Sequence, residues 1–355
     1  MQGGSSKGLF FLDNDLPQNL MAREALLLRI LSNYGISQQQ SDGSGGATSF
    51  SNQVAIVKAS ARPDCDIDYT FGAVAAPVTD QSMRIDWTNN CSHLTAAVGP
   101  FAVAQGLVPA TDGYTKVRIW QVNLGKRIDA YVPADAEIRL DFIDPAEADL
   151  LPTSNLKDWL AIPSLGKIAA TLMKVDSPIV FVRADALGLQ GRQNLVKTPN
   201  KITNSKKQSK QLELVCVYAA VAMGLAHDIR EAAAYPARLP TLCCLGKPAA
   251  YRTLQGADVA ADAMDILAQH FSVEGRTFDF DGSRSMALGL AAAIPGTIAN
   301  EIARTLPGIA TRIGHDFGVL TVGADVNQDG NLWRAEKVTI SRSARCLMSG
   351  WVHLG

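Results

Sequence analysis

Asn89-Asn90-Cys91-Ser92-His93, followed without a break by Leu94-Thr95-Ala96-Ala97-Val98-Gly99-Pro100-Phe101-Ala102, is the stretch around which the fold is organised. The small and aliphatic residues from Leu94 onward predict a helix that is buried on nearly every side. Asn and Ser commonly cap helix starts, which places Cys91 at the helix N-terminus. The helix dipole stabilises a thiolate there, so Cys91 is a candidate acid, base or nucleophile. A small buried residue is the alternative interpretation, and this stretch alone leaves both open.

The composition of the whole chain indicates a globular protein with two domains. Its 355 residues are 47% hydrophobic and 19% charged, with a formal net charge of -1, so two sizeable cores can form. The neutral charge balance and the scarcity of aromatic residues argue against nucleic-acid binding. The sequence contains neither a run of about 18 uncharged apolar residues nor a secretory signal. We therefore expect a soluble cytoplasmic protein with no nucleic-acid or membrane partner.

The cysteines follow neither a metal-binding nor a disulfide pattern. They form no CxxC pair and have no histidine at metal-ligand spacing, so the sequence predicts no metal site and a reducing compartment. The six positions are Cys65, Cys91, Cys216, Cys243, Cys244 and Cys346.

Glycine and serine gather in two stretches, each of which precedes a predicted strand. Met1 to Gly8 precedes Leu9 to Leu12, and Asp42 to Ser49 precedes Phe50 to Val57. Loops of this composition let backbone N–H groups approach an anion closely. The second loop lacks both the Walker lysine and the GxGxxG spacing, which favours carboxylates over a nucleotide. A flexible terminus and a flexible turn are the alternatives.

The rest of the chain predicts one architecture twice, as two sheets that each wrap a buried helix. The first half has strands near 67–78, 116–124, 128–132 and 137–142. A proline-rich hinge is expected near 145–155. The second half has strands at 168–175 and 179–183, and helices at 210–225 and 286–294. We expect the two helix starts to face each other across a cleft.

Several segments, in order from the first residue to the last few, resemble the PrpF family. They are Gly3 to Gly8, Asp42 to Ser49, Asn90-Cys91 with Val98 to Ala102, Leu151 to Thr153, Ser177 to Val182, and Ala344 to Met348. The resemblance implies an α/β (α+β) fold of the diaminopimelate-epimerase type. In this fold, two similar domains each wrap a curved, mainly antiparallel sheet around a central helix. We expect residues 1–145 with a returning strand at 340–355 in one domain and 146–339 in the other.

The resemblance also implies an activity and a set of site residues. The family comprises 2-methylaconitate cis-trans isomerases, methylitaconate isomerases and 4-oxalomesaconate tautomerases, which use no cofactor and are commonly homodimers. They isomerise the C=C bond of a small unsaturated polycarboxylate, and Cys91 would lie at the reacting carbons. The carried-over carboxylate-binding residues are Ser5, Ser6, Gly45, Gly46, Thr48 and Ser49. Further substrate-binding residues are expected at Lys7, Asn90, Ser92, Ser283 and Arg284.

The chain departs from the family at charged positions. Gln2 stands where an arginine is usual, and Gln53 stands where the family has its principal proton-transfer lysine. Glutamine cannot take up a proton at neutral pH. Lys58 is a poor replacement because it should point to the opposite face of the strand from Gln53. His93, in place of the usual asparagine, adds a titratable group, so the sequence predicts Cys91 and His93 as the acid–base pair.

Several hypotheses about function stay open at this point. An isomerase could move a proton through a dienolate, or the Cys91 thiolate could add to the alkene and be eliminated after rotation. The lost cations at Gln2 and Gln53 also suit a repurposed lyase or cyclase of a biosynthetic pathway, acting on a less anionic substrate. A non-catalytic binding protein is the third hypothesis.

Overall fold

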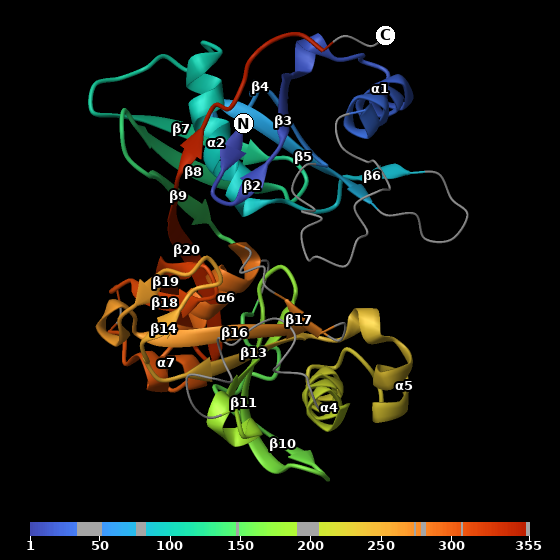
Figure 1. Ribbon diagram of the computed structural model, residues 1–355, viewed down its shortest axis with the longest axis vertical. Helices are drawn as coiled ribbons and strands as arrows, with labels where there is room; N and C mark the ends of the chain where they lie inside the picture. The colour runs from blue at the N-terminus through green and yellow to red at the C-terminus, as the bar shows by residue number, and fades with distance from the viewer. Residues whose placement is uncertain are drawn as a thin grey trace. The chain divides into compact units, whose positions relative to one another are not determined.

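The computed structural model describes residues 1–33, 52–75, 83–146, 149–189, 206–272, 275–277, 282–306 and 308–352, and the chain forms two compact units (Figure 1). One unit comprises Met1–Ile143 with Ser341–Gly355, and the other comprises Asp144–Ile340. We call them unit 1 and unit 2. Each combines a mainly antiparallel sheet with a buried helix, and the predicted α/β fold class is confirmed.

Unit 1 contains a sheet in the order β9-β8-β7-β5-β4-β3, with β6 beside β5. The β3–β4 and β5–β7 pairs are parallel, and the other pairs are antiparallel. The strands are β3 (Leu9–Leu12), β4 (Gln53–Ala59), β5 (Ile67–Ala75), β6 (Arg84–Asp86), β7 (Tyr114–Gln121), β8 (Lys126–Pro133) and β9 (Ile138–Ile143).

Two helices pack on this sheet. On one side, α1 (Leu20–Asn33) buries Leu27 and Leu31 against Val54 and Ile56 of β4. The other helix, α2 (Ser92–Ala104), is the expected small-residue helix, buried over most of its length. At Gly99 a Cβ would lie 2.8 Å from a methyl of Val132, so glycine lets α2 approach β8 closely.

A small sheet joins the two ends of unit 1. Its order is β2 (Ser6–Lys7), β1 (Gln2–Gly3) and β21 (Ala344–Arg345), with both pairs antiparallel. In Figure 1 the red C-terminal strand accordingly runs beside the blue N-terminal strands. A short 3-10 turn, η1 (Asp13–Asp15), follows β3.

Unit 2 repeats the succession of strand pairings seen in unit 1. Its order is β20-β19-β18-β16-β13-β12-β11-β10, with β17 beside β16, and the parallel pairs are β16–β18 and β12–β13. The strands are β10 (Asp158–Ile162), β11 (Gly166–Lys174), β12 (Pro178–Arg183), β13 (Thr241–Gly246), β16 (Ile266–Ser272), β17 (Gly275–Thr277), β18 (Thr311–His315), β19 (Gly318–Asp329) and β20 (Leu332–Arg342). A separate pair joins β14 (Tyr251–Arg252) to β15 (Asp258–Val259).

The helices of unit 2 include the second small-residue helix that the sequence predicts. It is α6 (Gly282–Ala293), which packs against β19 and starts four residues earlier than the predicted range, because Gly282-Ser283-Arg284 already forms its first turn. The remaining helices and 3-10 turns are α4 (Lys206–Ala222), α5 (Ile229–Ala234), α7 (Ile298–Ala303), η3 (Ala184–Leu187), η4 (Pro236–Arg238) and η5 (Ala261–Ala263). No helix in the described ranges is long and apolar enough to cross a membrane.

Candidate active site

Cys91 lies at the N-cap of α2, which confirms the predicted position of this thiol. Its backbone is extended, and its carbonyl accepts hydrogen bonds from the N–H (2.9 Å) and the hydroxyl (3.0 Å) of Thr95. The same hydroxyl also donates to Asn90 Oδ1 at 3.3 Å. The half-buried thiol therefore sits at the positive end of a helix that is shielded from water, where negative charge is stabilised.

The hairpin formed by β1 and β2 packs directly on the start of α2. A Cβ at Gly3 would lie 2.1 Å from the carbonyl oxygen of His93, and one at Gly4 would lie 2.4 Å from Nδ1 of the same residue. Gly4 also has a φ of +49°, in the left-handed region that favours glycine. The two glycines thus allow a contact between hairpin and helix that any side chain would push apart.

This contact brings four of the predicted site residues together. The Cys91 thiol donates to Ser6 Oγ at 3.4 Å, and the Ser6 side chain is only 1% exposed. The backbone N–H of Ser5 donates to His93 Nδ1 at 3.3 Å. The Ser5 hydroxyl is 3.4 Å from the same ring nitrogen. Ser5, Ser6, Cys91 and His93 therefore form one cluster, which we call the hairpin–helix cluster.

Gln53 and Tyr69 lie on the sheet face that carries α2. On β4, Val54 and Ile56 pack towards α1, so the alternate residue Gln53 points to the α2 side and Lys58 to the α1 side, as predicted. Lys58 is 3.8 Å from Asp68. The Gln53 Oε1 atom is buried and has no hydrogen-bond partner among the described residues.

Tyr69 is a neighbour of Cys91 that sequence reasoning missed. Burial raises its pKa well above the usual value, the nearby Cys91 thiol adds to the rise, and the Thr95 hydroxyl partly offsets it. The phenol therefore stays protonated at neutral pH. Alternation with Ile67 and Phe71 along β5 indicates only a core position, because a sequence does not say which core residues meet a helix start.

Other predicted residues of unit 1 lie outside this cluster. Lys7 is exposed and points to the opposite face of β2 from Ser6, because successive strand residues alternate. It is in register with Gln2, whose Oε1 accepts from Arg345 Nε at 3.0 Å, so a cation lies beside Gln2. Ser92 Oγ is buried with no partner among the described residues. Gly45, Gly46, Thr48 and Ser49 lie outside the described residues.

In unit 2, Ser283 and Arg284 occupy the first turn of α6. The Ser283 hydroxyl donates to Asp176 Oδ2 at 2.7 Å. Nearby, Cys243 on β13 lies opposite His270 on β16, with 3.5 Å between the sulfur and Nε2. Burial, together with the nearby charges of Arg284 and His315, lowers the pKa of His270 to about 3. Burial also raises the pKa of the Cys243 thiol, so this buried pair is neutral.

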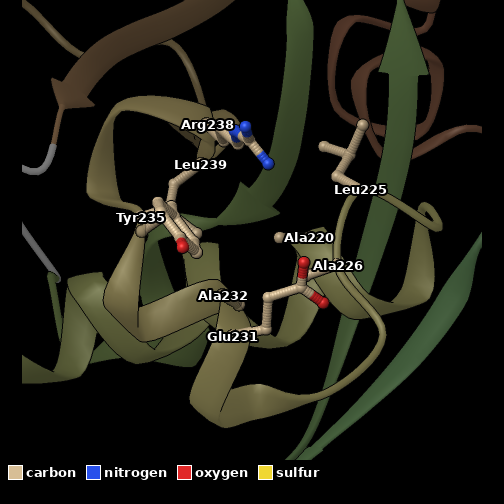
Figure 2. A pocket seen from close by; sticks show the side chains of 8 residues that line it. All are labelled: Ala220, Leu225, Ala226, Glu231, Ala232, Tyr235, Arg238 and Leu239. Atoms are coloured by element: carbon tan, nitrogen blue, oxygen red, sulfur yellow. The ribbon is translucent and has the colours of Figure 1, made fainter.

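A small pocket lies elsewhere in unit 2, between α4, α5 and η4 (Figure 2). Glu231 and Arg238 face it from opposite sides. Its lining comprises Ala220, Leu225, Ala226, Glu231, Ala232, Tyr235, Arg238 and Leu239. Since none of the predicted site residues lines it, this pocket does not mark the candidate active site. Within the described ranges, no group of three or more His, Cys, Asp or Glu side chains could hold a metal ion.

Comparison with known proteins finds full-length relatives. The sequence model of the PrpF protein family matches residues 1–136 and 127–355. The chain is 36% identical over 387 residues to a 2-methyl-aconitate isomerase of Cupriavidus necator, covering 100% of this chain and 96% of the relative. It is 31% identical over 378 residues to a 3-methylitaconate isomerase of Eubacterium barkeri, covering 100% and 96%. Among solved structures, a methylitaconate-delta-isomerase superposes with a TM-score of 0.78 at 27% identity, covering 99% of this chain and 97% of that one.

Proposed function

Because this chain belongs to the PrpF family, we propose that it is a cofactor-independent isomerase acting on the C=C bond of a small unsaturated di- or tricarboxylate. The names of the relatives support this substrate class, and the matches span the whole chain. The observation that carries the proposal is the Cys91 thiol at the N-terminus of α2, in contact with Ser6 of the glycine-rich hairpin. The positive end of the helix stabilises the thiolate form of a cysteine in this position, without a metal or an organic cofactor.

The start of α2 is suited to an anionic substrate. The first backbone N–H groups of a helix have no intrahelical acceptor and point out along its axis, where they attract a carboxylate. In this chain they point out beside Cys91 and the Ser6 hydroxyl. A substrate carboxylate held there places the adjacent alkene carbons next to the sulfur. The same N–H groups would stabilise charge that develops on that carboxylate during the reaction.

The side chains near Cys91 favour thiolate addition over proton transfer. The Gln53 amide cannot take up a proton at neutral pH, and Tyr69 stays protonated. In the proposed step, Cys91 Sγ forms a bond to the alkene carbon β to a carboxylate, and the π electrons move onto the α carbon as an enediolate. The remaining single bond rotates. The electron pair then restores the double bond and expels the thiolate, so no proton is gained or lost and no oxidant is needed.

The experiment is isomerisation in D2O, followed by proton NMR, with 2-methylaconitate and 3-methylitaconate as substrates. With 2-methylaconitate, addition and elimination give the geometric isomer without deuterium, whereas proton transfer incorporates deuterium. The terminal methylene of 3-methylitaconate has no geometric isomer, so any conversion of this substrate requires a proton transfer that shifts the double bond and incorporates deuterium. Deuterium in the product would therefore overturn the proposed step and leave the isomerase in place. If the folded protein converts neither substrate nor cis-aconitate, the isomerase proposal itself is wrong.

Cys91→Ser should abolish turnover, and Cys346→Ser is the matched control. Cys346 is an exposed thiol of unit 1 that donates a hydrogen bond to the Met348 carbonyl. We expect the control to keep wild-type activity. Equal activity of both variants would remove Cys91 from the reaction.

The proposal extends to a cytoplasmic homodimer. All six cysteines are free, and the chemistry requires Cys91 to remain reduced, which fits a reducing compartment. Light scattering of the purified protein tests the dimer: a mass of one chain across the working concentration range would reject it.

A further inference from the structure

The glycine-rich hairpin also contacts His93, through Gly4 and Ser5. The His93 side chain is only 7% exposed. Nδ1 accepts the Ser5 N–H at 3.3 Å, and the backbone of Gly4 lies so close that a Cβ there would be 2.4 Å from this nitrogen. The imidazole therefore fills the space beneath the turn at Gly4 and Ser5.

The direction of the Ser5 hydrogen bond fixes the form of the ring. A backbone N–H can only donate, so Nδ1 must present a lone pair, and the proton of the neutral imidazole must be on Nε2. Protonation of Nδ1 would point its N–H at the N–H of Ser5, so this hydrogen bond would be lost and the two donors would repel each other. The contact therefore favours the neutral ring, which cannot release a proton from Nδ1.

The position of His93 on the helix also indicates that its side chain does not act directly on that of Cys91. Residues two apart on a helix do not face each other. The hairpin contacts the two residues through different serines, with Ser6 on the thiol and Ser5 on the imidazole. Because Ser5 and Ser6 are adjacent in a tight hairpin, the position of Ser5 determines the position of Ser6.

We propose that His93 is a positioning residue for the reaction at Cys91. Its neutral Nδ1 holds the Ser5 N–H, and this bond seats the hairpin so that the Ser6 hydroxyl meets the Cys91 sulfur. The inference rests on the proposed function for its effect on turnover. It replaces the predicted acid–base pairing of Cys91 with His93 by a role that needs no proton transfer.

Three variants separate positioning from proton transfer. Asn places its amide oxygen near the position of Nδ1, whereas the longer Gln side chain matches Nε2 and Ala has no acceptor. We expect His93→Asn to keep kcat within about threefold of wild type. His93→Gln and His93→Ala should lower kcat by about 3- to 10-fold, the loss that corresponds to one hydrogen bond. Circular dichroism and thermal unfolding check that each variant is folded.

A spectroscopic measurement tests the inference without any substrate. Long-range proton–nitrogen NMR of nitrogen-15-labelled wild-type protein at pH 7 should show His93 as the neutral tautomer with its proton on Nε2. A protonated Nδ1 would overturn the inference even if the enzyme is active. In the kinetic experiment, equal loss in all three variants would restore the acid–base role, and wild-type rates in all three would leave His93 with no role. Failure of the wild type to turn over any substrate would reject the proposed function, while the tautomer still decides the placement of His93.

Discussion

Lowering the pH from 7 to 5 should destabilise unit 2 by about 2 kcal/mol through His270 alone. This side chain is 2% exposed and faces the Cys243 sulfur at 3.5 Å. Burial, with Arg284 and His315 nearby, lowers its pKa to about 3 in the folded protein. In the unfolded chain the pKa is about 6.5, so between these values only the unfolded state binds the proton. Stability therefore falls as the pH falls.

The size of the effect follows from the two pKa values. Each pH unit below about 6.5 costs about 1.4 kcal/mol until the folded protein itself begins to take up the proton near pH 3. Since the unfolded imidazole is only partly protonated above its pKa, the range from pH 7 to 5 contributes about 2 kcal/mol.

Urea unfolding at both pH values measures this effect. The stability lost by wild type between pH 7 and 5 should exceed that lost by His270→Gln by about 2 kcal/mol. Cys243→Ala is the control: it removes the contact, lowers stability at both pH values and keeps the pH dependence, because His270 remains buried. If His270→Gln retains the full wild-type pH dependence, then the imidazole is not held neutral in the folded protein.

Four further substitutions test close approaches and a buried hydroxyl. Gly3→Ala places a Cβ 2.1 Å from the backbone of α2, which forces the hairpin away from the start of the helix. We expect a marked loss of kcat in steady-state kinetics and a smaller effect on the midpoint of thermal unfolding. Gly289→Ala meets a methyl of Val322 at 2.4 Å and should cost about 1–3 kcal/mol in urea unfolding. Gly323→Ala, whose nearest contact is an ordinary 3.4 Å, should be tolerated. Tyr251→Phe removes a hydroxyl that shares its proton between the carbonyls of His315 and Gly318 and accepts the His315 N–H, and it should cost about 1–3 kcal/mol. An unchanged urea midpoint would contradict the importance of these hydrogen bonds.

The features that the sequence predicted well depend on local signals or on the family. The run of small residues after Cys91 indicates a buried helix, because such residues can pack closely on every side, and α2 confirms it. The resemblance to the PrpF family is confirmed over the whole chain. The predicted helix at 210–225 is observed as α4, Lys206–Ala222, displaced because its polar first turn carries no apolar period.

The contacts within the candidate site could not be predicted in the same way. Cys91 and His93 were paired because they are neighbours in sequence, yet the hairpin gives each of them a different serine about 85 or more residues away. Lys7 and Ser6 are also neighbours, and strand alternation separates them. Tyr69 on β5 is close enough to the Cys91 thiol for the two groups to interact electrostatically, and nothing in the sequence links these two positions. The roles of Gly45, Gly46, Thr48 and Ser49 stay predictions.

The small sheet of unit 1 imposes an order on biosynthesis. Strand β1 is held between β2 and β21, and Gly4 N–H also donates to the Ser343 carbonyl at 2.7 Å. Residues 341–345 reach the ribosome exit only after all of unit 2 has been translated. The nascent chain therefore lacks strand β21, which holds the hairpin that carries Ser6. The contact between Cys91 and Ser6 is completed as one of the last events of folding.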